Sequence, residues 1–91
     1  MDSHQAFDLT ISAIRDNIGG EITGTRFSET SFGSFYVSFS VSGLDRSILN
    51  DRGQLFICEQ PRGEGDCNLL FNDLRTVGEQ ELVSMLTAKL R

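Results

Sequence analysis

The chain has 91 residues, of which 38% are hydrophobic and 23% are charged, and its formal net charge at pH 7 is −5. This length and composition predict one soluble domain, residues 1–91, and argue against a disordered or multidomain chain. The acidic charge disfavours nucleic-acid binding, which needs Lys and Arg to neutralise phosphates. The longest apolar run, at 55–58, has four residues, whereas a membrane-spanning helix needs roughly 20.

Residues 3–18 are predicted to form an amphipathic helix. Asp2 and Gln5 have the spacing of a capping box, which satisfies the free backbone N–H groups at a helix start. The apolar residues that follow recur at intervals of four, three and four: Phe7, Ile11, Ile14 and Ile18. This spacing places them along one face of the helix. The pair Gly19-Gly20 is predicted to end it.

The clearest strand signal lies at residues 34–42, where apolar and hydroxyl side chains alternate strictly. The apolar set is Phe35, Val37, Phe39 and Val41. Because successive strand side chains point to opposite faces, this strand has an apolar face and a hydroxyl face. Residues 21–27 are predicted to form the preceding strand, with Gly24 marking a bulge.

A hairpin is predicted around residues 50–53, where Asn50 and Gly53 suit a type I turn with Gly53 at positive φ. The strand that follows is apolar at four successive positions, 55–58, so both of its faces are apolar. Two helices in so small a protein are expected to cover one face of the sheet. Phe56 and Cys58, with Tyr36, would then lie on the opposite face, which we call the open face.

Residues 61–67 are predicted to form a loop, since they combine a proline, two glycines and three charged residues. Residues 69–71 are interpreted as a last short strand, with a helical turn within 68–74 as the alternative. Thr76 and Glu79 have capping-box spacing and predict a C-terminal helix. Its apolar residues follow at helical spacing: Leu82, Val83, Met85, Leu86 and Leu90.

These elements predict an α+β two-layer sandwich. The sheet is an antiparallel β-meander of four to five strands, with an N-terminal and a C-terminal helix packed on one face. The apolar face of strand 34–42 is expected to meet the apolar stripes of both helices and form the core.

The sequence offers few groups for catalysis or metal binding. His4 is the single histidine, so a Cys or Ser nucleophile has one candidate base, and that base lies in the first helical turn. Glu64, Asp66 and Cys67 lack the spacing of a metal site, and Gly63-Glu64-Gly65 lacks the Lys-Ser/Thr pair of a phosphate loop. We therefore expect a non-enzyme without metal or cofactor.

The two cysteines, Cys58 and Cys67, are too few for a disulfide framework. Residues 1–5 lack the basic start and apolar segment of a secretory signal, which indicates a cytoplasmic protein. Although Cys58 and Cys67 could meet if their flanks paired as a hairpin, we expect two free thiols in a reducing cytosol.

The function that these observations favour is that of a small acidic protein-binding module, such as an inhibitor or an immunity or antitoxin-like protein that neutralises a larger protein. A helix, a small meander and a closing helix in a short acidic chain are common among immunity proteins and phage-encoded inhibitors, which is an analogy of size and shape. The expected partner is another protein, of basic charge, and a homodimer is a further option. The expected partner-binding residues are Tyr36, Phe56, Cys58, Arg62, Glu64 and Asp66.

The alternative function comes from another class. It is a small-molecule-binding domain, or a small enzyme, with a pocket between the sheet and the helices or at a homodimer interface.

Overall fold

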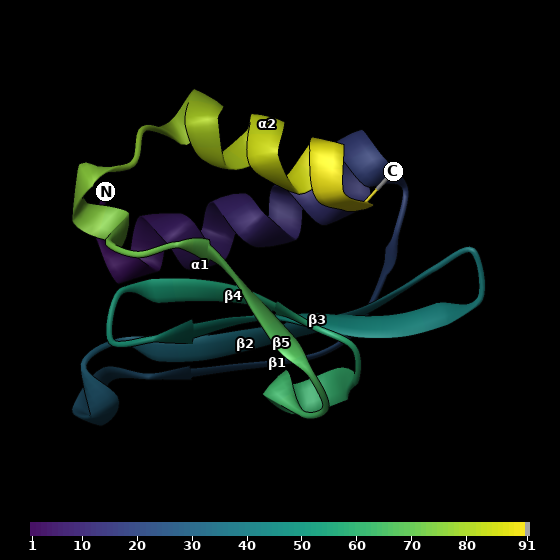
Figure 1. The fold of residues 1–91 in the computed structure, drawn as a ribbon, viewed down its shortest axis with the longest axis horizontal. Coiled ribbons are helices and arrows are strands. Elements are labelled where there is room, and N and C mark those ends of the chain that lie inside the picture. Colours follow the sequence, from purple (N-terminus) through teal and green to yellow (C-terminus); the bar gives the residue numbers. More distant parts are fainter. Residues whose placement is uncertain (91) are drawn as a thin grey trace.

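The computed structural model describes residues 1–90 and places two helices over a five-stranded sheet (Figure 1). Helix α1 spans Ser3–Ser12 and α2 spans Glu79–Leu90. The strands are β1 (Glu21–Ser28), β2 (Ser34–Val41), β3 (Leu44–Asp51), β4 (Gln54–Cys58) and β5 (Cys67–Phe71). Each strand pairs antiparallel with the next, in the order β1-β2-β3-β4-β5.

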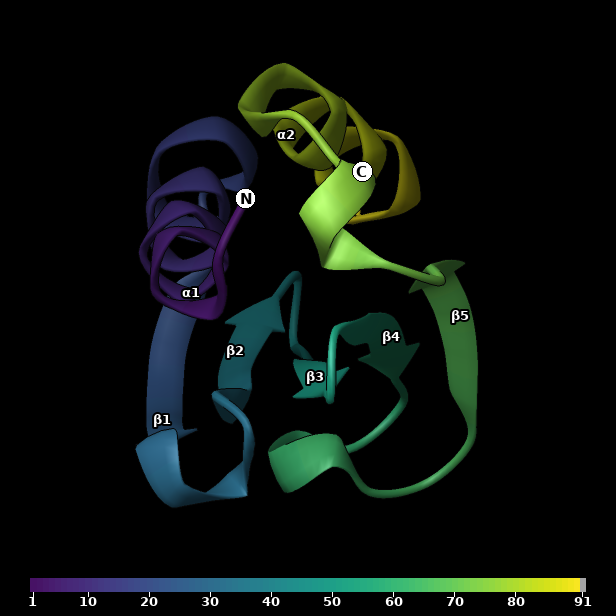
Figure 2. The same ribbon diagram turned by 90° about the vertical axis from the view of Figure 1, so that its left-hand side faces the viewer.

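Both helices lie on one face of this meander, and Figure 2 shows the two layers end-on. The loop between β4 and β5, green in Figure 2, lies on the side of the sheet away from the helices. The α+β fold predicted from the sequence is therefore confirmed.

The apolar face of β2 provides the centre of the core. Phe35, Val37 and Phe39 are at most 2% exposed, and Ile48 of β3 and Leu55 of β4 are fully buried beside them. The helices contribute the remaining buried or partly buried apolar residues that were expected: Phe7, Ile11, Ile14, Ile18, Leu82, Leu86 and Leu90. The ring of Phe7 lies 5.2 Å from that of Phe35, which joins α1 directly to β2.

The N-terminal helix begins as predicted but changes its hydrogen bonding in its second half. Gln5 N–H donates to the Asp2 side chain at 2.8 Å, and both halves of the capping box are present. Residues Ala13–Ile18 form a π-helical turn that Gly19 closes in the left-handed conformation, with φ of 74°. Gly20 has a different role, because a Cβ atom there would lie 2.9 Å from the side chains of Ile14 and Val41.

The two tight hairpins use a turn that differs from the predicted one. Arg52 and Gly53, between β3 and β4, both have positive φ, of 54° and 92°. Positive φ at both central residues is the signature of a type I′ turn, whose twist matches that of the paired strands. The expected positive φ at Gly53 is confirmed, but the type I assignment was wrong. Ser42 and Gly43, between β2 and β3, repeat the pattern with φ of 52° and 79°.

The start of α2 also differs from the prediction. The helix begins at Glu79, so Thr76 is not its cap, and the Thr76 hydroxyl donates instead to the carbonyl of Asp73. Glu81 accepts from the N–H of Gly78 at 3.3 Å. The sequence pattern identified the helix but placed its cap two residues too early. Two other expectations are confirmed, namely a bulge beside Gly24 and a strand at 69–71.

Candidate functional site

One row of side chains crosses the open face of the sheet from edge to edge. Strand register pairs Arg26 of β1 with Tyr36 of β2, Tyr36 with Leu49, Leu49 with Phe56, and Phe56 with Leu69. Tyr36 is two positions from Ser38, whose hydroxyl binds the loop on the side away from the helices, so the row shares that face. Four of its members are apolar or aromatic, and we call them the apolar row: Tyr36, Leu49, Phe56 and Leu69.

The apolar row is partly accessible from solvent. Tyr36, Leu49 and Phe56 are half-buried, and Leu69 is 51% exposed. Sequence reasoning placed Tyr36 and Phe56 on the open face, and the register brings them into the same row with Leu49 between them. Leu49 and Leu69 were not singled out, because strand register cannot be derived from the sequence.

The loop at residues 59–66 folds back over the open face. Its Gly63 lies against Leu49 of the apolar row, because a Cβ atom on Gly63 would be 3.1 Å from the Leu49 side chain. The N–H of Arg62 donates to the hydroxyl of Ser38 at 2.9 Å, and the N–H of Gly63 donates to the hydroxyl of Ser47 at 2.9 Å. Ser47 in turn donates to the carbonyl of Gln60 at 2.7 Å. The two serines are at most 3% exposed, so they bind the loop and do not form a solvated surface.

A disulfide between Cys58 and Cys67 joins the two ends of this loop. The residues are cross-strand partners in β4 and β5, with Cα atoms 4.1 Å apart. The expectation of two free thiols was wrong, because it rested on an assumed compartment and not on the hairpin that brings the side chains together. Cys58 is only 1% exposed, so it positions the loop and does not present its side chain on the surface.

The loop itself displays the other three predicted residues, Arg62, Glu64 and Asp66, all of which are exposed. Its backbone closes on itself, since Glu59 N–H donates to the Asp66 carbonyl at 3.0 Å and Gln60 N–H to the Glu64 carbonyl at 3.3 Å. The structure thus brings five of the six predicted residues to the surface of the open face and buries the sixth beneath it.

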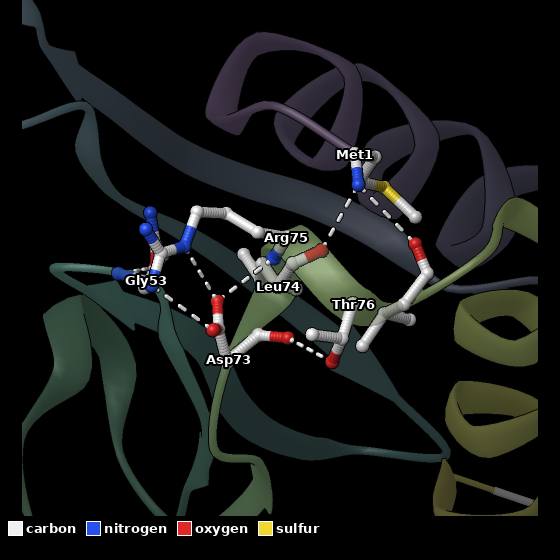
Figure 3. Close-up of polar contacts among 8 residues, drawn as sticks. Met1, Gly53, Asp73, Leu74, Arg75 and Thr76 are labelled. Atoms are coloured by element: carbon white, nitrogen blue, oxygen red, sulfur yellow. Dashed lines mark hydrogen bonds and ion pairs between the residues drawn. The ribbon is translucent and has the colours of Figure 1, made fainter.

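A separate hollow lies at the end of the sheet where the chain begins. It has a volume of about 910 Å³, and its lining includes Arg52, Phe32 and Arg75. Figure 3 shows the wall beside it, where the amino group of Met1 donates to the carbonyls of Leu74 and Val77 at 3.0 and 3.3 Å.

In the same wall the Arg75 guanidinium binds both carboxylate oxygens of Asp73, at 3.0 and 3.1 Å (Figure 3). These side-chain hydrogen bonds are the main cause of a lowered pKa for Asp73, and a hydrogen bond from the Arg75 backbone N–H lowers it further.

His4 takes part in a surface cluster rather than in a catalytic arrangement. Its ring lies 4.3 Å from that of Phe27, and its Nε2 atom is 3.6 Å from a carboxylate oxygen of Glu29. Within residues 1–90, no three His, Cys, Asp or Glu side chains are grouped closely enough to hold a metal ion. Over the same part of the chain, neither helix has the length and apolar character needed to cross a membrane.

Comparisons of the chain with protein-family models, with curated proteins and with solved structures gave no match. The function is therefore inferred from the site alone.

Proposed function

We propose that the protein acts by binding another protein through the open face of its sheet, as an inhibitor or an immunity or antitoxin-like protein. The observation that supports this most is the apolar row, which is partly accessible and adjoins a loop that presents Arg62, Glu64 and Asp66.

The composition of the surface suits a protein interface. Protein interfaces combine an apolar, aromatic centre with a polar rim, and Tyr, Phe and Arg are over-represented in them. Here Tyr36 and Phe56 provide aromatic groups at the centre of the sheet, and the loop provides the rim on one side. The exposed Leu69 extends the apolar row to the edge of the sheet.

The loop is fixed before any partner arrives. It is held by the Cys58–Cys67 disulfide and by its hydrogen bonds to Ser38 and Ser47. A fixed loop loses less conformational entropy on binding than a mobile one, so a larger share of the contact free energy contributes to affinity. This rigidity favours a role in which binding itself is the activity, as in inhibition.

The charge of the rim indicates the kind of partner. Glu59, Glu64 and Asp66 are exposed within eight residues of one another, and the chain as a whole carries a net charge of −5. Such a surface accelerates association with a basic partner and repels an acidic one. We therefore propose a basic patch on the partner opposite the loop.

The test is an affinity capture from the native host with the wild-type chain, Phe56→Asp and Glu64→Arg. Leu44→Asp and Asp8→Arg are matched controls, since Leu44 is 59% exposed at the start of β3 and Asp8 is exposed on α1. We expect both open-face variants to fold, as judged by circular dichroism, and to lose a partner that both controls retain. If the folded open-face variants keep every partner, the open face is not the binding surface.

A second candidate function, small-molecule binding, is favoured by the hollow at the Met1 end. Its volume of about 910 Å³ lies within the range of natural ligand sites. Arg52 in its lining would suit an anionic ligand, whereas Arg75 is paired with Asp73. A thermal-shift screen against metabolites tests this role, because a ligand of the native state raises the melting temperature further as the ratio of its concentration to its Kd increases. Arg52→Ala should abolish such a shift.

A further inference from the structure

The two edges of the sheet are not equivalent. Natural proteins protect exposed edges with charged side chains and bulges, because an unpaired strand edge can pair with another chain. The β1 edge has both devices, since Glu21 and Arg26 are exposed and the register shifts between Ile22 and Gly24. The β5 edge also has a register shift, between Leu69 and Phe71, but it has neither charge nor proline in Cys67–Phe71, and its pairing with β4 is regular over Cys67, Asn68 and Leu69.

An apolar hollow lies beside the β5 edge, between this strand and α2. Its volume is about 480 Å³, and it is lined by Phe71, Gln80, Glu81, Ser84, Met85 and Ala88. Phe71 pairs with the buried Leu55, so it faces the helical side of the sheet. A strand added next to β5 would place every second side chain toward this hollow and the others toward the exposed Leu69.

The charges near the edge indicate what such a strand must carry. Glu81 is the one charged side chain among the residues that line the hollow, at the Phe71 end of β5. At the other end, the exposed Asp66 and Glu64 precede Cys67. An occupant with Lys or Arg at its ends would complement both acidic groups. Two copies of this chain would bring acidic ends together in either strand direction, so the charges disfavour self-pairing.

We infer that the β5 edge, together with the hollow beside α2, receives an extended basic segment of another protein as a sixth strand. Backbone hydrogen bonds along Cys67–Leu69 would supply affinity, and the hollow would select an apolar side chain at one alternate position. This inference rests on the proposed function in so far as the partner is a protein, and it adds the mode of recognition.

The test is a selection of displayed random 12-residue peptides against the full-length oxidised chain, followed by affinity measurement of synthetic peptides. We expect enriched peptides with alternating apolar residues and a Lys or Arg near an end. Their addition should shift the amide NMR signals of β5 and of residues 84–88. Affinity should fall at least tenfold for Ala88→Trp, which fills the hollow, and for Glu81→Lys, which reverses its charge. Asp8→Trp on the exposed side of α1 is the control and should bind normally.

Three outcomes would overturn the inference: no enriched peptide, enriched peptides that bind Ala88→Trp as tightly as wild type, or a concentration-dependent dimer that shifts the same β5 amides without peptide. The last outcome would assign the edge to a second copy. None of these affects the affinity capture with Phe56→Asp, so failure at the β5 edge and failure at the open face are distinguishable.

Discussion

The hydroxyl oxygen of Ser38, in the middle of β2, accepts a hydrogen bond from the backbone N–H of Arg62 at 2.9 Å. These two residues are 24 positions apart, and their contact fixes the 59–66 loop over the open face. Ser38, on the face of β2 opposite its core residues, therefore serves the tertiary structure. Together with Ser47 it supports the loop, and the apolar row stays partly exposed around Gly63, which lies against Leu49.

Ser47 is the residue on which this support depends most. It is fully buried, and its hydroxyl both accepts from Gly63 N–H and donates to the Gln60 carbonyl. Ser47→Ala would leave both backbone groups without their partner, so we expect a loss of about 1–3 kcal/mol in the free energy of unfolding. Urea denaturation measures this loss, and hydrogen exchange at the Gly63 amide should accelerate.

Ser40→Ala is the matched control for this substitution, because Ser40 lies on the same face of β2 and is only half-buried. We expect a change within about 0.5 kcal/mol for the control. Equal stability of Ser47→Ala and Ser40→Ala would show that the loop does not depend on the buried hydroxyl.

Asn50 joins three segments at the opposite end of β3. Its amide donates to the carbonyl of Gly33 at 3.0 Å, and its side-chain oxygen accepts from Gly53 N–H at 2.9 Å. Because Asn50 is fully buried, Asn50→Ala leaves two groups without a partner, and we expect a loss of about 2–4 kcal/mol. Asn72→Ala, at an exposed position that accepts one bond from Gln54, should cost less than about 1 kcal/mol in the same urea titration.

The sequence predicted the fold because each element carries a local signal. Strict alternation in β2 identified a strand with one apolar face, and the Asp2–Gln5 spacing identified the start of α1. These signals depend on residues near one another in the chain. The second capping box failed for the same reason, since Thr76 instead donates to Asp73 in a turn whose local pattern resembles a helix start.

The site was less predictable because it depends on pairing between strands. Tyr36 and Phe56 become neighbours through Leu49 only once the register of three strands is set. The serines of β2 indicated a hydroxyl face, but nothing in their spacing shows that a residue 24 positions later binds the hydroxyl of Ser38. The disulfide likewise follows from the β4–β5 hairpin, which aligns Cys58 with Cys67.

The Asp73–Arg75 pair predicts a specific titration. Hydrogen bonds from Arg75 lower the pKa of Asp73 in the folded state, so the pair stabilises the fold above the pKa of the unfolded carboxyl group. That contribution is lost as the pH falls through the lower, folded pKa. A carboxyl ¹³C NMR titration should give Asp73 a pKa below its ordinary value.

Arg75→Ala should raise the pKa of Asp73 but not restore it fully, because the backbone N–H of residue 75 still donates to the carboxylate. Arg62→Ala is the control, because it removes a guanidinium from the 59–66 loop and should leave the pKa of Asp73 unchanged. An Asp73 pKa that is the same in wild type and Arg75→Ala would contradict this assignment.

The disulfide should contribute to stability as well as to the position of the loop. Cys58 and Cys67 are 9 residues apart, and closing so short a loop in the unfolded chain is worth about 2–3 kcal/mol in the entropic account. We therefore expect the urea midpoint to fall when the protein is reduced with dithiothreitol, and the double variant Cys58→Ala/Cys67→Ala to match the reduced protein. The double variant is also the control, since dithiothreitol should not change its midpoint.

Reduction should act on the loop before it acts on the rest of the sheet. Reduction removes one restraint on residues 59–66, so the amides of Arg62 and Gly63 should exchange faster. The hydrogen bonds of this loop to Ser38 and Ser47 remain, and the amides of β2 should stay protected. Combining reduction with Ser47→Ala removes both restraints. Because the restraints act on one segment, the combined loss in the free energy of unfolding should differ from the sum of the two separate losses. Strict additivity, with no change in exchange at Gly63, would show that the disulfide and the buried hydroxyl do not act on the same loop.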